Sequence, residues 1–378
     1  MQNPFKNLWG ALQTGGGSVI GIDIGSAYMK LVQLRRKNGQ AVLETYGELA
    51  LGPYAGASVG SATNLPVSKL VEALRDIVRE SRVTTQDAAI AIPLTSSLLT
   101  IIPMPSLDPK EFGTMVPIEA RKYVPTPISE VNLNWWILPK EAASAASALP
   151  EESSSQQIPS ADIGTVDVLI AAIHNEALRR FEDIGKGAKL NVSFFEIEVF
   201  STMRSALIDS LDIEMIIDLG AGESKVFIID AGLVRFSHTI NQGAQDLTVA
   251  LSRALSIPQA EAEELKRRAG LTEEEITREA AGSLVAVVNF IFSEANRVLL
   301  AYQRRSGRQV QRVMLAGGGA NLRGLLDYAG QSFGVPVERA QPFDKVEAPA
   351  FVEELLDVVG PEFSVAIGIA LRKLEEMG

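Results

Sequence analysis

The chain has 378 residues, 46% of them hydrophobic and 6% aromatic, which is enough for two or more domains with cores of their own. The net charge of −11 argues against non-specific nucleic-acid binding. The absence of cysteine excludes disulfides, thiolate metal sites and a catalytic thiol, and with only His174 and His238 a histidine-rich metal site is excluded as well.

The sequence predicts neither a membrane span nor a signal peptide. The longest apolar run, within Leu284–Phe292, is far shorter than the roughly 20 residues that a membrane helix needs. Residues 1–17 have no continuous apolar core. For Asn3–Trp9 we expect a frayed terminus, with a short amphipathic contact to a surface or partner as the alternative.

The chain opens with two apolar strands, Val19–Ile24 and Tyr28–Val32, joined by a turn of small residues. The turn Gly25-Ser26-Ala27 leaves backbone N–H groups open to an incoming anion. Asp23 ends the first strand and can hold a metal ion through water, while Lys30 adds a positive charge. This hairpin is therefore a candidate phosphate site.

The rest of the first half predicts strands and helices in alternation. The elements up to the middle of the chain are a strand Ala41–Leu49, a helix Ser68–Glu80, strands Ala88–Ile92 and Leu98–Pro103, a helix from Asp108 to Tyr123 with a kink or break near Pro117, and a strand Val131–Leu138. Lys140–Ile163, rich in Ala and Ser, predicts a flexible insertion. After it we expect a strand Thr165–Ile173, a helix Asn175–Lys186, a strand Val192–Glu196 and a helix Glu198–Asp209.

The spacing of the first hairpin returns in Glu214–Asp230. Asp218 is followed by Gly two residues later and by Lys225 seven residues later, with apolar strands on both sides. For one copy alone we would favour an ordinary hairpin whose strand lysine reaches solvent. Two copies in one chain indicate a duplicated phosphate-binding hairpin.

Helices dominate the remaining sequence. We expect a strand Leu233–Ile240, helices Gly243–Leu255, Pro258–Ala269, Thr272–Ala280 and Ser283–Arg304, a strand Gln311–Ala316, a helix from the glycine loop to Phe333, a strand Val335–Glu338 and a closing helix Pro361–Met377. Strands and helices alternate within two comparable halves. The pattern predicts an α/β fold of two duplicated domains around a cleft.

The glycine loop Gly317–Asn321 follows a strand and lets the flat face of a ligand approach the backbone. Its spacing matches neither a Rossmann fingerprint nor a Walker A loop. Together, Gly21–Lys30, Ile217–Ser224 and Leu315–Asn321 resemble the two phosphate motifs and the adenosine motif of the actin-like ATPase superfamily. Ser364–Ala370 is similar to the small-residue helix that crosses between its two halves.

This resemblance implies an actin-like ATPase fold with a small inserted subdomain in its N-terminal half. The implied division is residues 1–87 and 166–210 for the N-terminal domain, 88–165 for the insertion, 211–362 for the C-terminal domain and 363–378 for the closing helix.

A narrower segment, from Ile102–Asp108 through Glu119–Pro127, resembles the PilM family of type IV pilus assembly. That resemblance implies a cytoplasmic protein that binds ATP and Mg²⁺, with at most slow ATPase activity. Its partners would be the N-terminal cytoplasmic peptide of the inner-membrane protein PilN, bound in a groove beside the insertion, and other pilus assembly proteins. The protein would be recruited to the inner face of the membrane without spanning it, and self-association is a further expectation.

The resemblance also implies roles for single residues. Asp23 and Asp218 would face each other and hold Mg²⁺ through water, while Glu198 would position a water or only compensate a helix N-terminus. Glu263 and Lys266 would contact the ribose, with a charged solvent-facing surface as an equal alternative. The other nucleotide-binding residues would be Gly25, Ser26, Tyr28 and Lys30 in the first hairpin, Gly220 and Gly222 in the second, and Gly317, Gly318 and Asn321 in the glycine loop.

Two alternatives keep the fold but change the function. A sugar or acetate kinase would need a catalytic base, for which we find no segment beyond the nucleotide motifs. A cell-division protein resembling FtsA would usually end in a basic amphipathic helix, whereas Leu371–Gly378 ends the sequence sooner.

Overall fold

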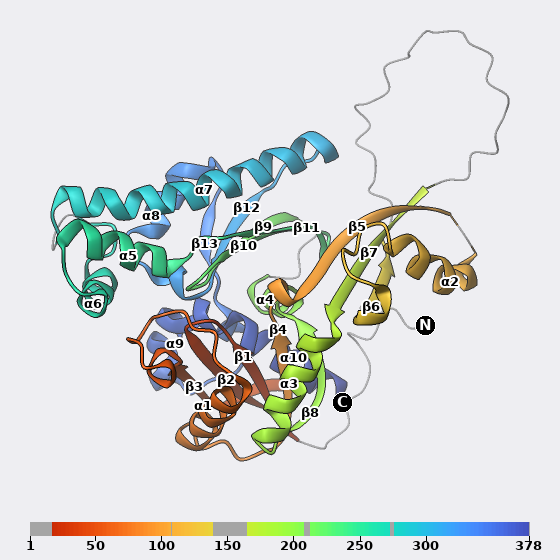
Figure 1. Ribbon diagram of the computed structural model, residues 1–378, viewed down its shortest axis with the longest axis horizontal. Coiled ribbons are helices and arrows are strands. Elements are labelled where there is room, and N and C mark those ends of the chain that lie inside the picture. Colours follow the sequence, from red (N-terminus) through yellow and green to blue (C-terminus); the bar gives the residue numbers. More distant parts are fainter. Residues whose placement is uncertain (1–16, 107, 139–164, 208–211, 273–275, 378) are drawn as a thin grey trace, which may run out of the picture.

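The computed structural model describes residues 17–106, 108–138, 165–207, 212–272 and 276–377. Asn3–Trp9 and the insertion Lys140–Ile163 lie outside these residues. The described strands form three sheets (Figure 1). Two are five-stranded, in the orders β3-β2-β1-β4-β8 and β11-β10-β9-β12-β13, and the third is three-stranded, in the order β5-β7-β6.

The first sheet is formed by β1 (Ser18–Ile24), β2 (Tyr28–Lys37), β3 (Gln40–Ala50), β4 (Asp87–Ile92) and β8 (Asn191–Ile197). β1, β2 and β3 pair antiparallel, while β4 pairs parallel to β1 and to β8. One face is covered by α1 (Val67–Glu80) and α3 (Asn175–Gly187), and the other by α10 (Ser364–Glu376). Because both faces are covered, the central strands are almost wholly apolar.

The second sheet repeats this plan with β9 (Ile213–Leu219), β10 (Ser224–Asp230), β11 (Leu233–Ile240), β12 (Arg312–Ala316) and β13 (Val337–Arg339). Again an antiparallel meander is followed by two parallel strands. Its helices are α5 (Ala244–Leu255), α6 (Gln259–Ala269), α7 (Arg278–Ser306) and α8 (Leu325–Phe333), which share one core. The repeated strand order confirms the predicted duplication.

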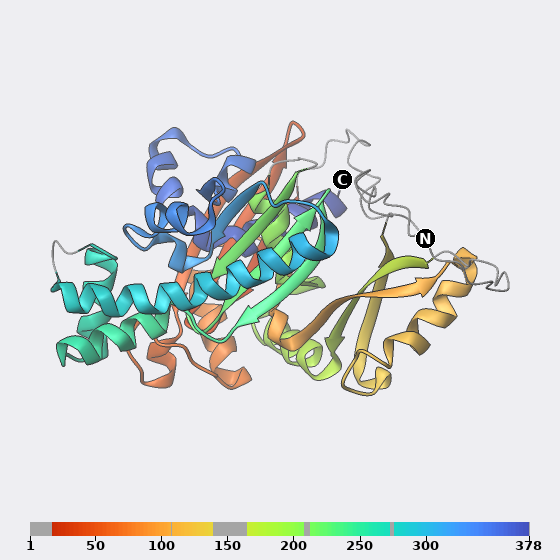
Figure 2. The ribbon, with the colours of Figure 1, turned by 90° about the horizontal axis from the view of Figure 1, so that it is seen from above.

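The third sheet is formed by β5 (Ser97–Pro105), β6 (Val131–Ile137) and β7 (Thr165–His174), all antiparallel. Helix α2 (Pro109–Ala120) packs Phe112 and Val116 on one face of it. This unit projects from the side of the first sheet (Figure 2). Strand β4 belongs to the first sheet and β7 to the three-stranded sheet. The domain boundaries, which put residues 88–165 in the insertion, stay a prediction.

Several predicted elements need correction. The expected break between the helices Thr272–Ala280 and Ser283–Arg304 is wrong, because α7 runs from Arg278 through Gly282 without a break; of the expected first helix only its last three residues belong to α7, and residues 273–275 lie outside the described residues. The helix expected to start at the glycine loop is a short 3-10 turn, Gly318–Asn321, separated from α8 by Gly324 with φ +79°. Helix α2 runs through Pro117 without a break but ends at Ala120, before Tyr123. Helix α9 (Glu353–Val359) was not predicted.

The helix α4 (Glu198–Ala206) lies against α10 and ties the first sheet to the C-terminal end of the chain. The link is electrostatic: Glu196 of β8 is buried and accepts hydrogen bonds from Arg204 at 2.8 and 2.9 Å and from Arg372 at 2.5 Å. Burial alone would raise the pKa of Glu196, but the two guanidinium groups outweigh it and lower the pKa below its ordinary value.

We expect Glu196→Gln to lower the free energy of unfolding by about 3 kcal/mol, because two arginines lose a buried counter-charge. Since the pKa of Glu196 is lowered in the folded state, its contribution is complete above the ordinary value of 4.5 and is lost as the pH falls through the folded value. Urea denaturation at pH 7.5 and pH 3.5 measures this. An equal difference between variant and parent at both pH values would contradict it.

Candidate functional site

A cleft of about 1410 Å³ opens between the two five-stranded sheets. It is lined by the ends of both hairpins, the start of α4, one side of α6 and the glycine loop. Every residue that the sequence analysis assigned to a site lines this one cleft: Asp23, Gly25, Ser26, Tyr28, Lys30, Glu198, Asp218, Gly220, Gly222, Glu263, Lys266, Gly317, Gly318 and Asn321. Segments almost 300 residues apart are thus brought together.

The turns of the two hairpins face each other across the cleft. A Cβ placed on Gly222 would lie only 3.3 Å from Ser26 Oγ. The first turn is closed by a backbone bond, in which Gly25 N donates to Tyr28 O at 3.0 Å, and the second turn is held to the start of α5, where Ala244 N donates to Gly220 O at 2.9 Å. Two opposed small-residue turns form a concave surface that suits a chain of phosphate groups.

Two carboxylates, Asp23 at the end of β1 and Asp218 in β9, face this space. Burial raises the pKa of Asp23 to about 7, with the nearby carboxylates adding to the rise and Lys30 opposing it. Burial likewise raises the pKa of Asp218 to about 6, opposed mainly by Lys225. Both carboxyl groups are thus easily protonated. A cation bound beside them would favour their charged form.

Lys225 of β10 is a site residue that the sequence analysis left unassigned. It is buried, so the alternative of an ordinary hairpin whose lysine reaches solvent is wrong here. Its Nζ lies 2.9 Å from Glu198 Oε1 and 3.3 Å from Glu223 Oε1. Burial lowers the pKa of Lys225, but these carboxylates and Asp218 raise it more, and the net shift is upward. The repeat of the acid-to-lysine spacing was the signal for this role.

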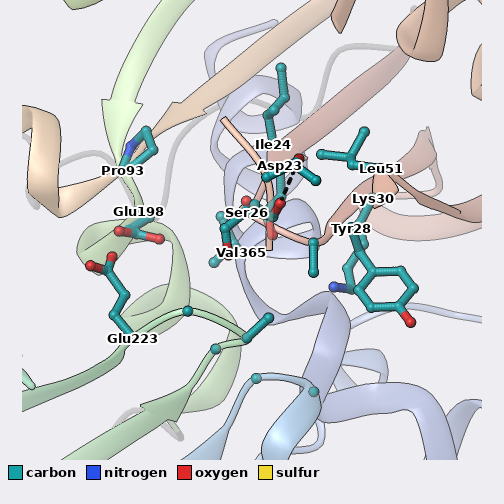
Figure 3. A pocket seen from close by; sticks show the side chains of 18 of the residues that line it. Asp23, Ile24, Ser26, Tyr28, Lys30, Leu51, Pro93, Glu198, Glu223 and Val365 are labelled. Carbon is teal, nitrogen blue, oxygen red and sulfur yellow. Dashed lines mark hydrogen bonds between the residues drawn. The ribbon is translucent and has the colours of Figure 1, made fainter. Parts of the chain in front are cut away.

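Glu198, the first residue of α4, is held from two sides. One carboxylate oxygen accepts a hydrogen bond from Leu94 N at 2.5 Å, and the other accepts from Lys225 Nζ at 3.0 Å. Figure 3 shows Glu198 and Glu223 together on one side of the cleft, opposite Asp23 and Ser26. Glu198 therefore joins the two halves of the molecule, which neither of its predicted roles described.

Gly317 adopts φ +79° beside Asp218. A Cβ at this position would lie 2.3 Å from Asp218 Oδ1, so only glycine fits. Next to it, Asn321 Nδ2 donates to Glu362 Oε1 at 2.8 Å, while its buried Oδ1 has no hydrogen-bond partner among the described residues. A buried acceptor left open at the cleft is suited to a donor from a ligand.

Glu263 and Lys266 of α6 are buried, so the alternative of a charged solvent-facing surface is wrong. Lys266 Nζ lies 2.7 Å from Glu263 Oε2 and donates to Ala244 O at 3.0 Å. Arg267 continues the network by donating to Glu263 Oε1 at 2.9 Å and to the Tyr28 hydroxyl. Because Tyr28 belongs to the first hairpin, this contact crosses the cleft.

The donor set fits Mg²⁺ better than a metal that the protein encloses by itself. Among the residues that the structure describes, no group of three or more carboxylate or imidazole side chains gathers at one point. Mg²⁺ keeps several waters and is commonly held by one or two carboxylates together with substrate phosphates. Asp23 and Asp218 supply such a pair.

Without nucleotide and Mg²⁺, we expect Asp23→Asn to raise the melting temperature at pH 8 by at least about 2 °C. The pKa of Asp23 rises from 3.8 to about 7 on folding, so stability falls as the pH rises through this window, and asparagine removes the loss. The gain should be smaller at pH 5. Calorimetric melting at both pH values measures it; a variant less stable than the parent at pH 8 would contradict the argument.

Residues 21–374 match the family model described as type IV pilus assembly protein PilM. The chain belongs to the PilM family. The PilM–PilN type IV pilus biogenesis complex has a similar fold, with a TM-score of 0.76 and 24% identity over 94% of this chain and 98% of that one. The ethanolamine utilization protein EutJ from Carboxydothermus hydrogenoformans is more distant, with a TM-score of 0.52 and 14% identity over 97% and 93% of the two chains.

The cell division protein FtsA of Pseudomonas aeruginosa is 26% identical over 185 residues. This match spans 43% of the present chain and 42% of FtsA. The PilM family model covers far more of the chain, so the FtsA-like alternative is the weaker one. The duplicated sheets and the similar solved structure agree on an actin-like α/β fold, and the family model that matches the chain is that of a type IV pilus assembly protein.

Proposed function

We propose that this PilM-family chain binds ATP with Mg²⁺ in the cleft and uses the bound nucleotide to control docking of a PilN peptide. The observation that carries the proposal is the convergence of two carboxylates, two opposed small-residue turns and a glycine loop on one cleft. The two turns would hold the phosphates, with Mg²⁺ between them and Asp23 and Asp218. Gly317 and Gly318 would lie against the adenosine.

Lys30 is the cation available to the phosphates. Its Nζ lies 3.7 Å from Glu48 Oε1 and has no closer recorded carboxylate among the described residues. Lys225, in contrast, already has two carboxylates within 3.3 Å. Because Mg²⁺ and Lys30 would share the phosphate charge, Lys30 would stabilise bound ATP by charge-assisted hydrogen bonds.

Slow turnover would fit the state of Glu198. Both of its oxygens already accept a hydrogen bond, from Leu94 N and from Lys225, which restricts how the carboxylate could turn to position an attacking water. Binding of ATP, rather than rapid hydrolysis, would therefore set the conformation of the two halves. The kinase alternative is weaker, because the PilM family model spans residues 21–374.

The same cleft extends to the base of the three-stranded unit, where a partner peptide would dock. Its lining there comes from the start of α1 with the segment before it, the segment between β4 and β5, the end of β7, and α3: Thr63, Asn64, Leu65, Pro66, Val67, Leu70, Pro93, Thr95, Ser96, His174, Glu176, Ala177, Arg179, Arg180, Phe181 and Asp183. We call this lining the side groove. It combines apolar side chains with polar and charged ones, and Arg180 holds its two walls together by donating to Leu65 O at 2.8 Å.

The related complex contains PilM with PilN, which supports a PilN peptide as the occupant. Because the side groove and the phosphate turns line one continuous cleft, nucleotide binding and peptide binding would each favour the same arrangement of the two halves. Peptide binding would also hold this cytoplasmic protein, and with it other pilus assembly proteins, at the inner face of the membrane.

We expect Ala177→Glu to weaken PilN-peptide binding at least about tenfold, since it puts a larger, charged side chain beside the apolar residues of the side groove. A carboxylate in the first turn of α3 suits the helix dipole, so folding should be unaffected. Fluorescence anisotropy with a labelled peptide of the first residues of PilN measures this, with Ala260→Glu on α6 as the matched control. Equal affinities for both variants and the parent would remove the side groove from the proposal.

A further inference from the structure

Helix α7 carries exposed apolar residues on the side that faces away from the second sheet. It is long and apolar enough to cross a membrane by length and composition alone. Its buried residues pack into the core of the second half, which accounts for one side of it. On the exposed side, the outer face of α7 is defined here as Gly282, Ala286, Phe290, Ser293, Arg297, Leu300 and Arg304, and Asn289, Ala301 and Arg305 are exposed beside it.

The outer face of α7 is a continuous stripe, because its residues follow one another at intervals of three or four. Phe290 is 48% exposed and Leu300 is 47% exposed, although both are large and apolar. In two perpendicular views no ribbon of the described residues lies on this side of α7 (Figures 1 and 2). A surface of this length and apolarity is typical of a contact with another molecule.

Along this stripe, a large and a small residue lie at equal distances from Ser293. If a second α7 lay antiparallel with the two Ser293 residues opposite each other, Leu300 of one copy would face Ala286 of the other, because both are seven residues from Ser293. By the same count Arg297, four residues from Ser293, would face Asn289 of the second copy. The large Leu300 would thus meet a small residue in both halves of the pair.

The charges at the ends of the stripe are complementary in the same register. Arg304 would lie opposite Gly282 of the second copy, one helical turn from its Glu279, or about 4.5 Å along the axis. Arg304 and Glu279 are both exposed, and neither has an ion pair among the described residues. An antiparallel pair would therefore form this Arg–Glu contact twice, as two-fold symmetry requires.

We propose that the outer face of α7 is a self-docking surface, on which a second copy of this chain binds through its own α7 in antiparallel orientation about Ser293. A single helix pair is smaller than a standard stable interface of about 1,600 Å². The dimer is therefore weak, with a dissociation constant of roughly 10 μM to 1 mM. It becomes significant where many copies are held close together.

An anionic membrane surface suits this face less well. The chain as a whole is acidic, and Arg297 already lies 2.5 Å from Glu294. That leaves Arg304 and its neighbour Arg305 as the cations that could contact an anionic bilayer. The centre of the stripe, at Ser293, has no apolar side chain to insert into lipid.

Charge exchange separates the two possibilities. Sedimentation velocity of the full chain at about 10–500 μM should show a dimer for the parent and a loss of at least about fivefold in association constant for Arg304→Glu and for Glu279→Arg alone. The double variant should regain the dimer, because the contact is restored with reversed signs. If each single variant weakens the dimer and the double variant does not restore it, the proposed contact between Arg304 and Glu279 is wrong.

Disulfide formation tests the register, and the chain offers a clean background because it has no cysteine. Ser293→Cys should form a disulfide-linked dimer under mild oxidation, whereas Ala260→Cys, on the exposed side of α6, should not. Vesicles containing about 30% phosphatidylserine provide the competing outcome. Vesicle binding that is lost in Arg304→Glu, without any dimer or disulfide, would assign this face to a membrane and overturn the proposal.

Discussion

Gly368→Ala is expected to lower the free energy of unfolding by about 3 kcal/mol, one of the largest effects of any single methyl group in this chain. Gly368 lies in the middle of α10, where a Cβ would come within 1.8 Å of Ser201 O in α4. Because the obstacle is a backbone carbonyl, a change of side-chain rotamer cannot relieve it, and the two helices must move apart. The hydrogen bond from Arg204 Nη1 to Gly368 O, at 2.9 Å, would be disturbed as well.

Gly330→Ala is the matched control. Gly330 also lies inside a helix, α8, but no atom lies within 4 Å of the position that its Cβ would occupy. Alanine there should stabilise the protein by about 0.5–1 kcal/mol, because glycine is unfavourable in a helix. Urea denaturation of both variants measures the two changes. If both substitutions changed the free energy of unfolding in the same direction, the close packing of α10 on α4 would not explain the glycine at position 368.

Asp218→Asn is expected to weaken binding of ATP with Mg²⁺ about 100-fold at pH 8. At a charge separation of about 6 Å, as for an ion held through water, losing one carboxylate costs roughly 2.8 kcal/mol at an effective dielectric constant of about 20, or about 100-fold in affinity. Asparagine keeps the size of the side chain, so the loss reports charge. Isothermal titration of ATP with Mg²⁺, and again with EDTA, measures it: in the parent Mg²⁺ should strengthen binding, and in the variant it should have little effect.

The pKa of Asp218 sharpens this experiment. Because it is about 6, the carboxyl of the parent is largely protonated at pH 5 and resembles asparagine. The difference between parent and variant should therefore shrink at pH 5. Asp183→Asn, which removes a charge from another part of the same cleft, controls for net charge and should keep the Mg²⁺ effect. A 100-fold loss that is identical at pH 5 and pH 8 would contradict a role for the ionised carboxylate.

Local patterns predicted most of the fold. The two hairpins were visible because acid, glycine and lysine recur at the same spacing, and the structure places Asp23 opposite Lys30 and Asp218 opposite Lys225 in matching registers. One error was the gap at residues 281–282 between two expected helices. Gly282 interrupts nothing in α7, because a helix tolerates glycine at a modest cost when packing holds it.

Contacts between distant segments could not be predicted. Nothing in the sequence around Glu196 indicates that Arg372, 176 residues later, lies 2.5 Å from it. In the same way, the burial of Lys225 depends on Glu198, which belongs to the other half of the molecule. A charged side chain is free to sit in solvent or in a buried pair, and only the three-dimensional arrangement decides between them.

The central claim is that the cleft holds ATP with Mg²⁺ and thereby controls the partner peptide. Its most direct test is the affinity of the purified chain for a labelled N-terminal PilN peptide, measured by anisotropy with Mg²⁺ alone and with Mg²⁺ plus 1 mM ATP. We predict that ATP changes this affinity at least about fivefold in the parent and leaves it unchanged in Asp218→Asn. An affinity that is the same with and without ATP in the parent, at full occupancy of the cleft, would contradict the account.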